Sequence, residues 1–197
     1  MAYPDLIPLM MFMFAAAFTP GPNNFLSSYS GFNFGIKKTL PLIYGVTFGF
    51  PILVIAINSG LIIIFKKFPV LQESIKILGS GFILYFAYKI AFSKNNKEQQ
   101  IKNPIKFFNM LFFQFINPKA VVFAIILVST FIKTNENFLR DTVIVMSVAI
   151  IFSFVSILSW CLLGKFLRRF AKNKKFIQVF NYVMSFLLIA CIILIYL

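Results

Sequence analysis

A proline-rich break interrupts the first long apolar stretch of the chain. It consists of Thr19-Pro20-Gly21-Pro22-Asn23-Asn24, and a second break, Asn117-Pro118-Lys119, follows in the other half of the chain. Proline and glycine leave backbone groups without helical hydrogen-bond partners, and hydrocarbon cannot supply any. Irregular backbone at membrane depth is therefore tolerated only where protein or a water-filled cavity provides the hydrogen bonds. The two breaks therefore predict a substrate path, and we interpret the chain as a small transporter.

The composition is that of a polytopic membrane protein. Of 197 residues, 60% are hydrophobic and 12% are charged, whereas soluble domains carry roughly 25% charged residues. The net charge of +14 does not indicate a nucleic-acid partner, because the basic residues lie mainly in short segments between apolar runs, where topology signals lie. The expected surroundings are the lipid bilayer, with no nucleic acid bound.

Six apolar stretches are each long enough to cross a bilayer, which takes about 20 residues. The predicted spans are Leu6–Phe34, Leu40–Phe65, Val70–Phe92, Phe107–Ile132, Phe138–Leu163 and Phe176–Leu197. Because the first residues include Asp5 and no lysine or arginine, a cleavable signal peptide is disfavoured and the first stretch is expected to remain. The expected fold class is an all-α integral membrane protein with six transmembrane helices, the first and fourth broken at proline.

Basic residues are distributed unevenly among the five connections. The first, third and fifth connections hold 12 lysines and arginines, and the second and fourth hold 4. The positive-inside rule therefore predicts that both termini lie outside. The polar segment 93–106 is predicted to be a flexible cytoplasmic linker between a three-helix unit at 1–92 and another at 107–197, which together form one membrane domain.

The two halves show a weak internal repeat. A shift of 98 positions superposes Phe18-Thr19-Pro20 on Ile116-Asn117-Pro118, and places the second and third apolar stretches on the fifth and sixth. A three-helix unit repeated in tandem must enter the membrane from opposite sides, which gives a 3+3 inverted repeat with its pseudo-twofold axis in the membrane plane. Such an architecture places substrate at the midplane, between the broken helices.

The first break offers groups that suit an amino acid. Pro20 and Pro22 remove two amide donors, Gly21 loosens the turn, and a new helix N-terminus is expected around Asn23 and Asn24. A helix N-terminus attracts a carboxylate, and asparagine side chains can accept from an ammonium or donate to a carboxylate. The alternative is a proline kink that the asparagines merely cap.

Lys119 is the sharpest single candidate in the second break. It lies about 12 residues from each end of its stretch, roughly 18 Å of helix, which exceeds the reach of a stretched lysine. A central lysine costs about 2.5–3.5 kcal/mol to insert, so a functional site is the default expectation. Predicted roles are binding the substrate carboxylate or changing protonation state; the alternative is a structural lysine bonded to carbonyls freed by the first break.

Further polar residues accompany Lys119. Gln114 and Asn117 are three residues apart, which predicts a polar stripe on one helix face together with Pro118 and Lys119. Isolated polar residues could extend the stripe, but hydrogen bonding between helices explains them equally well; they are Asn58, Asn181, Ser153, Ser156 and Ser27-Ser28. The sequence alone does not favour any of these singly.

Glycines and the remaining titratable residues are the last candidates. Gly45, Gly49 and Gly79 predict close helix packing, with a mobile hinge as the alternative. No acidic residue lies deep in an apolar run and there is no histidine, so proton coupling through such a group is not expected. Cys161 and Cys191 lack metal-ligand spacing. We therefore expect no metal, no cofactor and no catalytic residue.

These motifs resemble the LysE/RhtB amino-acid exporters, which carry Thr-Pro-Gly-Pro-Asn-Asn on the first helix and Asn-Pro-Lys on the fourth. The match covers nearly the whole chain and includes Gly45, Gly49 and Gly79. Gln114-Phe115-Ile116-Asn117, Ser129-Thr130-Phe131 and Trp160 followed by Gly164 look most like the branch that exports cysteine and O-acetylserine. Phe50-Pro51 departs from the family, because many relatives carry a polar residue just after the second-helix glycines.

The resemblance implies a secondary transporter and not an enzyme. It implies export of small neutral amino acids or derivatives, cysteine/O-acetylserine-like or homoserine/threonine-like, across a bacterial cytoplasmic (inner) membrane, driven by the proton gradient. The expected ligand is an amino acid, and assembly as a homo-oligomer is compatible with it.

Three other functions compete with export. A membrane thiol-electron carrier shares the six-helix inverted plan, but carries cysteines at the breaks, where this chain has Asn23 and Asn117. An intramembrane hydrolase would need a serine within about 3 Å of the Lys119 amine. A non-transporting membrane assembly factor is the third alternative, and it predicts no substrate flux.

Overall fold

The fold is all-helical throughout the part of the chain that the computed structural model describes, residues 3–61, 63, 67–92, 104–132, 138–171 and 174–196. Its elements are α1 (Tyr3–Phe18), α2 (Pro22–Ala56), the π-helical turn η1 (Ile57–Leu61), α4 (Pro69–Ala91), α5 (Phe107–Ile116), α6 (Pro118–Phe131), α7 (Phe138–Arg168) and α8 (Lys174–Tyr196). No strand occurs in these ranges. The all-α class expected from the apolar stretches is confirmed.

Several helices are long and apolar enough to cross a membrane. Four segments meet this test alone: Pro22–Leu61, Glu73–Ala91, Phe138–Arg168 and Lys174–Leu194. The pair α5 and α6 adds a fifth span if the two are counted as one helix bent by 68° at Asn117. The break expected in the fourth stretch is thus present. α1 is apolar but short by itself, so the sixth span, which would join α1 to the start of α2, stays a prediction.

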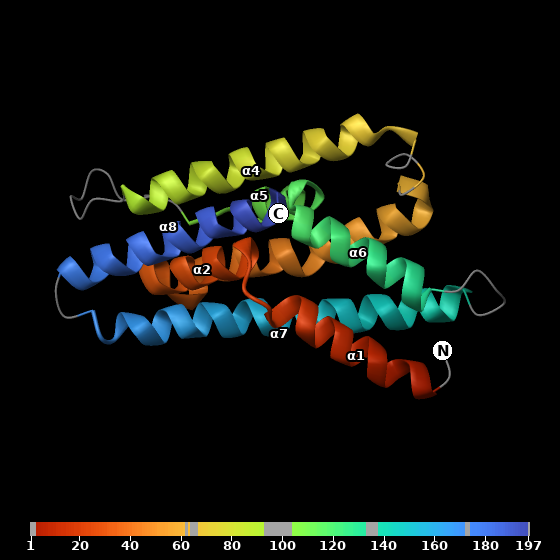
Figure 1. The fold of residues 1–197 in the computed structure, drawn as a ribbon. Helices are drawn as coiled ribbons and strands as arrows, with labels where there is room; N and C mark the ends of the chain where they lie inside the picture. The colour runs from red at the N-terminus through yellow and green to blue at the C-terminus, as the bar shows by residue number, and fades with distance from the viewer. Residues whose placement is uncertain are drawn as a thin grey trace.

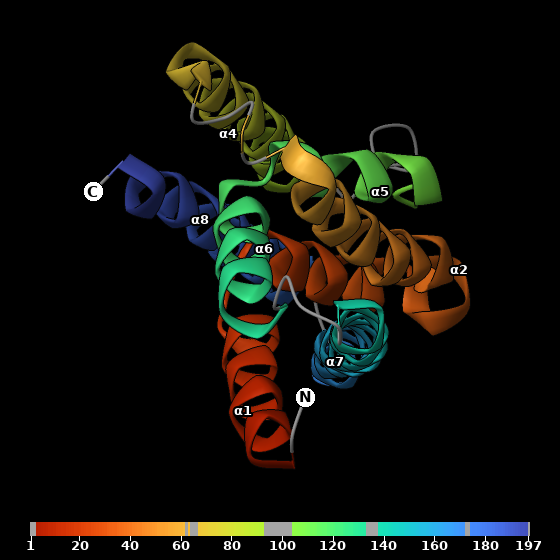
Figure 2. The ribbon, with the colours of Figure 1, turned by 90° about the vertical axis from the view of Figure 1, so that its right-hand side faces the viewer.

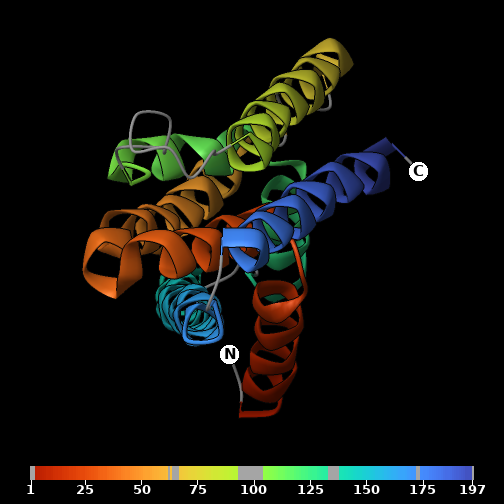
Figure 3. The ribbon, with the colours of Figure 1, turned by 90° about the vertical axis from the view of Figure 1, so that its left-hand side faces the viewer.

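Helix α2 reverses direction at Gly35. This glycine has φ 74° and ψ 173°, a backbone conformation that residues with a side chain rarely adopt. Figure 3 shows the α2 ribbon folding back on itself, so residues 22–34 and 36–56 form two arms of a helical hairpin. The reversal falls between the first and second predicted stretches, which end at Phe34 and begin at Leu40.

The other helices surround the two arms of α2. α7 packs along α2 in the most extensive helix contact, and α4 packs against α8, where Ser185 Oγ donates to Ala87 O at 2.8 Å (Figure 1). Figure 2, which looks along α7, shows α6 next to both α1 and α2, and these helices are in contact. Two apolar cores result, one around Phe32 and Phe113 and the other around Met13 and Val121.

The helix ends lie in two groups, at the two ends of the bundle. In Figure 1 the reversal of α2, the C-terminal ends of α4 and α7 and the N-terminal end of α8 lie at one end, and the N-terminal ends of α1, α4 and α7 and the C-terminal end of α6 lie at the other. Among the described residues, the first end carries the basic pair Lys37-Lys38 and Lys165, Arg168, Arg169, Lys174 and Lys175. Linker residues 93–103, with Lys66, Lys133 and Lys172, lie outside the described residues.

Two helix boundaries differ from the sequence prediction. α7 continues to Arg168 instead of ending near Leu163, and Gly164, just beyond the predicted end, packs closely on the backbone of α2 at Ser28. Within the second stretch the α-helix ends at Ala56 and passes into the π-helical turn η1, in which Gly60 has φ 111°; the predicted end of the stretch, Phe65, lies outside the described residues. Hydropathy reports only the length of an apolar run, so it predicts neither the extra turn nor the change of helix type.

The three glycines singled out from the sequence lie where helices touch. A β-carbon on Gly45 would lie 2.4 Å from Phe107 O, and one on Gly49 would lie 2.9 Å from Leu111 O. One on Gly79 would lie 1.9 Å from Ile116 O, the last carbonyl of α5. α2 and α4 can therefore approach α5 and the second break this closely only with hydrogen at these positions. A hinge role stays a prediction.

The replacement Gly79→Ala is expected to destabilise the protein by ~1–3 kcal/mol, since its methyl group would overlap the end of α5. Gly81→Ala, two residues along the same helix, is the matched control, because a β-carbon at Gly81 meets nothing within 4 Å. That control should be neutral or stabilising by up to ~1 kcal/mol. Thermal unfolding in detergent measures both, and equal stability of the two variants would contradict this close approach.

Candidate functional site

A cavity lies where the two breaks meet. The empty space in it, including the part that opens outward, is about 520 Å³. Its walls come from both apolar cores, with Val46 and Ile157 from one and Met13, Phe50 and Ala120 from the other. The cavity thus lies between the two apolar cores.

Most of the residues expected to bind substrate line this cavity. They are Gly21, Pro22, Asn23, Asn24, Gln114, Asn117 and Lys119. Thr19, Pro20 and Pro118 do not line it: the first two are exposed in the turn between α1 and α2, and the third begins α6. These three residues therefore belong to the breaks without lining the cavity, and substrate binding by them stays a prediction.

The Asn24 side chain, in the first turn of α2, hydrogen-bonds backbone carbonyls at the first break. Helix α2 begins at Pro22, and no side chain forms a capping hydrogen bond at its N-terminal residue, Gly21. Instead, Asn24 Nδ2 donates to Ala17 O at 3.0 Å and to Thr19 O at 2.9 Å. The asparagine thus serves the orphaned carbonyls at the end of α1, because helix ends leave their last carbonyls without intrahelical partners. For Asn24 this geometry matches the alternative in which the asparagines cap the proline kink.

Lys119 bridges the two breaks. Its Nζ donates to Thr19 O at 2.6 Å and to Pro20 O at 3.3 Å, and lies 5.7 Å from the centre of the Phe123 ring. This geometry matches the structural alternative, a lysine bonded to carbonyls that the first break frees. An ammonium has three hydrogens, so one donor remains for a ligand in the cavity that Lys119 lines.

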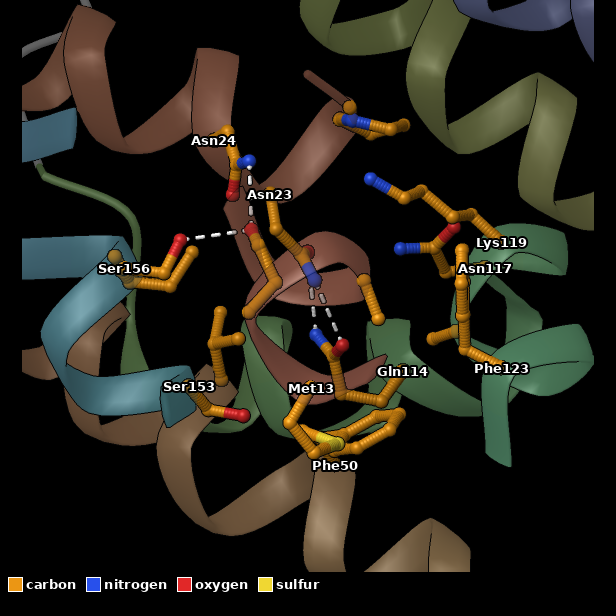
Figure 4. Close-up of a pocket in the computed structure, with 17 residues that line it drawn as sticks. Met13, Asn23, Asn24, Phe50, Gln114, Asn117, Lys119, Phe123, Ser153 and Ser156 are labelled. Atoms are coloured by element: carbon orange, nitrogen blue, oxygen red, sulfur yellow. Dashed lines mark hydrogen bonds between the residues drawn. The ribbon is translucent and has the colours of Figure 1, made fainter. Parts of the chain in front are cut away.

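Asn23 and Gln114 form a reciprocal amide pair across the cavity. Asn23 Nδ2 donates to Gln114 Oε1 at 2.8 Å, and Gln114 Nε2 donates to Asn23 Oδ1 at 3.3 Å (Figure 4). Gln114 Nε2 also donates to Met110 O at 2.8 Å, within its own helix. The pair joins the first turn of α2 to the last turn of α5.

Asn117 is not on the helix face that its spacing predicted. Its backbone is extended, with φ −85° and ψ 106°, because it is the residue at which α5 ends and α6 turns away. The single polar stripe is therefore wrong, although Gln114 and Asn117 both line the cavity. Asn117 Oδ1 is buried and has no hydrogen-bond partner among the described residues. Such an orphan acceptor in a native fold requires an explanation.

Two serines of α7 complete the polar lining. Ser156 Oγ donates to Ala17 O at 2.7 Å, and Ser153 also faces the cavity. The sequence placed both among residues that helix packing explains equally well, and no local signal separates them from other serines of α7. Only the packing of α7 against the first break identifies them. Asn58 and Asn181 do not line the cavity.

Comparison with known proteins identifies the family of the chain. The sequence model of a family described as LysE type translocator matches residues 14–196. The cysteine/O-acetylserine efflux protein of Escherichia coli O139:H28 (strain E24377A / ETEC) is 28% identical over 184 residues, 91% of each chain. Proteins of the same name from Escherichia coli (strain K12) and Shigella flexneri serotype 5b are 27% identical with the same coverage. No solved structure matches significantly.

The amide pair predicts energetic coupling between Asn23 and Gln114. Asn23→Ala and Gln114→Ala should each destabilise the protein, and the double variant should lose less than the sum, with a coupling of ~0.5–3 kcal/mol. The reason is that each single variant leaves its partner amide unpaired. The free energies of unfolding of the two single variants and the double variant, measured in detergent, give the coupling. As a control, Asn23→Ala is combined with Ser159→Ala, an exposed change on α7, and these two effects should be additive. Strict additivity of Asn23→Ala and Gln114→Ala would show that the pair does not form.

Proposed function

The chain belongs to the LysE type translocator family, and we propose that it exports small neutral amino acids or their derivatives from the cytoplasm. The names of its relatives make cysteine and O-acetylserine the first candidate substrates, with homoserine- or threonine-like compounds as alternatives. The observation that carries the proposal is the meeting of both proline breaks around one cavity, with the Lys119 ammonium between them.

The substrate carboxylate is assigned to the end of the cavity that holds Lys119. The first intrahelical bond of α2 runs from Phe25 N to Gly21 O at 3.0 Å, so the backbone amides of Asn23 and Asn24 precede it and have no partner within the helix. These amides and the positive end of the helix dipole favour an anion. Together with Lys119 Nζ they offer charge-assisted hydrogen bonds to a carboxylate.

The substrate ammonium is assigned to Asn117 Oδ1. This buried acceptor has no donor among the described residues, and an ammonium supplies donors only. The residues that line the cavity include one lysine and no carboxylate. A zwitterion with an uncharged side chain therefore suits the cavity better than a cationic amino acid, whose second positive charge would be left without a counter-charge.

Six spans in a 3+3 inverted repeat are the proposed architecture, with units 1–92 and 107–197. Two contacts between residues 98 positions apart support it, since counterparts meet only near a pseudo-twofold axis. A β-carbon on Gly21 would lie 3.0 Å from Lys119 Nζ, and Ser185 Oγ donates to Ala87 O. The repeat offset found in the sequence thus coincides with contacts at two places in the fold.

The basic end of the bundle is assigned to the cytoplasm of a bacterial inner membrane, which puts both termini outside. The proton gradient is the proposed driving force. Because no acidic residue lines the cavity, a coupled proton would be carried by Lys119, by a peripheral carboxylate or by the substrate itself.

The competing functions fit the site less well. Neither Cys161 nor Cys191 lines the cavity, which argues against electron transfer between the breaks. Ser153 and Ser156 lie on the opposite side of the cavity from Lys119 (Figure 4), so neither is placed to be activated by that amine. A translocator family also favours transport over hydrolysis and over a purely structural role.

Export should depend on the Lys119 ammonium. In cells preloaded with labelled cysteine or O-acetylserine, Lys119→Ala should lower uncoupler-sensitive export by about 10-fold or more, because a charged hydrogen bond contributes ~1.5–3 kcal/mol. Lys76→Ala is the matched control, since Lys76 is paired with Glu73 and neither residue lines the cavity. Full export by a correctly inserted Lys119→Ala protein would refute this carboxylate site, and no export of any amino acid by the wild type would refute the proposed function.

The proposed topology predicts opposite accessibility of two exposed lysines. In a background with Cys161 and Cys191 replaced by alanine, Lys67→Cys should react with a membrane-impermeant maleimide in intact cells. Lys38→Cys should react only after the membrane is permeabilised, because it lies beside the reversal of α2, at the basic end. The opposite pattern would reverse the orientation, and equal labelling of both would overturn the spanning arrangement.

A further inference from the structure

Ser153 differs from the other serines of α7 in its hydrogen bonding. Ser147 and Ser159 donate to the carbonyls four residues back, at 2.8 and 2.7 Å, as helix serines commonly do. Ser156 donates across to Ala17 O. Ser153 is only 7% exposed, lines the cavity and has no hydrogen-bond partner among the described residues. This hydroxyl bonds neither its own helix nor a neighbouring one and borders the cavity, so a ligand in the cavity can supply its hydrogen-bond partner.

The position of this hydroxyl divides the cavity into two ends. Figure 4 shows Ser153 Oγ pointing toward Met13 and Phe50. Lys119 and Asn117 lie on the other side of the amide pair between Asn23 and Gln114. One end is therefore strongly polar, and the other is apolar apart from the hydroxyls of Ser153 and Ser156, of which that of Ser156 already donates to Ala17 O.

We propose that Met13, Phe50 and Ser153 form a subsite for the substrate side chain, in which Ser153 is a specificity-determining residue that selects small side chains carrying a hydrogen-bond acceptor. This inference rests on the proposed function, because it requires the ammonium and carboxylate to occupy the opposite end. A thioether and an aromatic ring favour apolar and soft groups, and the absence of charge at this end disfavours ionised side chains.

The chemistry of the hydroxyl defines the preferred side chain. An ester carbonyl accepts a hydrogen bond from Ser153 Oγ, and the rest of an O-acyl side chain packs on Met13 and Phe50. An apolar or ether side chain of similar length fills the same space but offers a weak acceptor or none. Binding it leaves a buried hydroxyl unpaired, which disfavours it by about 3- to 10-fold for a hydrogen bond of ordinary strength.

A matched pair of compounds tests the role of Ser153. O-acetylserine carries the ester carbonyl, and O-ethylserine has a side chain of similar length without it. The measured quantity is the ratio of their export rates from preloaded cells that express the full-length protein. The wild type should favour O-acetylserine, and Ser153→Ala should reduce this preference by about 3- to 10-fold while it still exports O-ethylserine. Ser153→Cys, which keeps the shape but donates weakly, should reduce it as well.

Ser147→Ala and Ser159→Ala are the controls, because these serines lie exposed on the same helix and bond their own backbone. Both should keep the wild-type ratio. An unchanged ratio in active Ser153→Ala or Ser153→Cys protein overturns the subsite and leaves the proposed function intact. Failure of the wild type to export any amino acid overturns the proposed function and this inference with it.

Discussion

The hydrogen bonding of the carbonyls at the first break is the constraint on which the rest of the site depends. Ala17 O accepts from Asn24 and Ser156, Thr19 O accepts from Asn24 and Lys119, and Pro20 O accepts from Lys119. The donors belong to α2, α6 and α7, and α6 and α7 lie far from α2 in sequence. Since hydrocarbon offers no donors, the break can exist only when these helices converge. The cavity is the space enclosed by that convergence.

The kind of partner that Lys119 has is as important as its position. Its ammonium is held by main-chain carbonyls, and no acidic residue lines the cavity around it. A carboxylate partner would neutralise the charge, and a substrate would then have to displace a buried ion pair, whose separation is strongly unfavourable. Carbonyls stabilise the ammonium without cancelling its charge. The same interaction therefore supports the fold and leaves an anion site available to a ligand.

Residues that are locally costly in a membrane could be recognised from the sequence alone. Proline breaks and a central lysine are anomalies in an apolar run, so the pattern of residues is enough to single out Asn24, Lys119 and the break at Asn117. The polar stripe on the fourth stretch failed because the bend that Pro118 causes removes Asn117 from the helical repeat. Ser153 and Ser156 share their local pattern with Ser147 and Ser159. Only the three-dimensional packing of α7 against the first break separates those that face the cavity.

The proposed repeat also explains why its two halves carry different residues at equivalent positions. Gly21 and Lys119 are related by the offset of 98 and touch, since a β-carbon on Gly21 would lie 3.0 Å from both Cδ and Nζ of the lysine. Two lysines at such a contact would repel and overlap, and two glycines would leave the freed carbonyls without a donor. The first half must therefore supply space, through Gly21, and the second half must supply the positive charge, through Lys119. A symmetric backbone can hold a single ammonium near its axis only if the sequence at that axis is asymmetric.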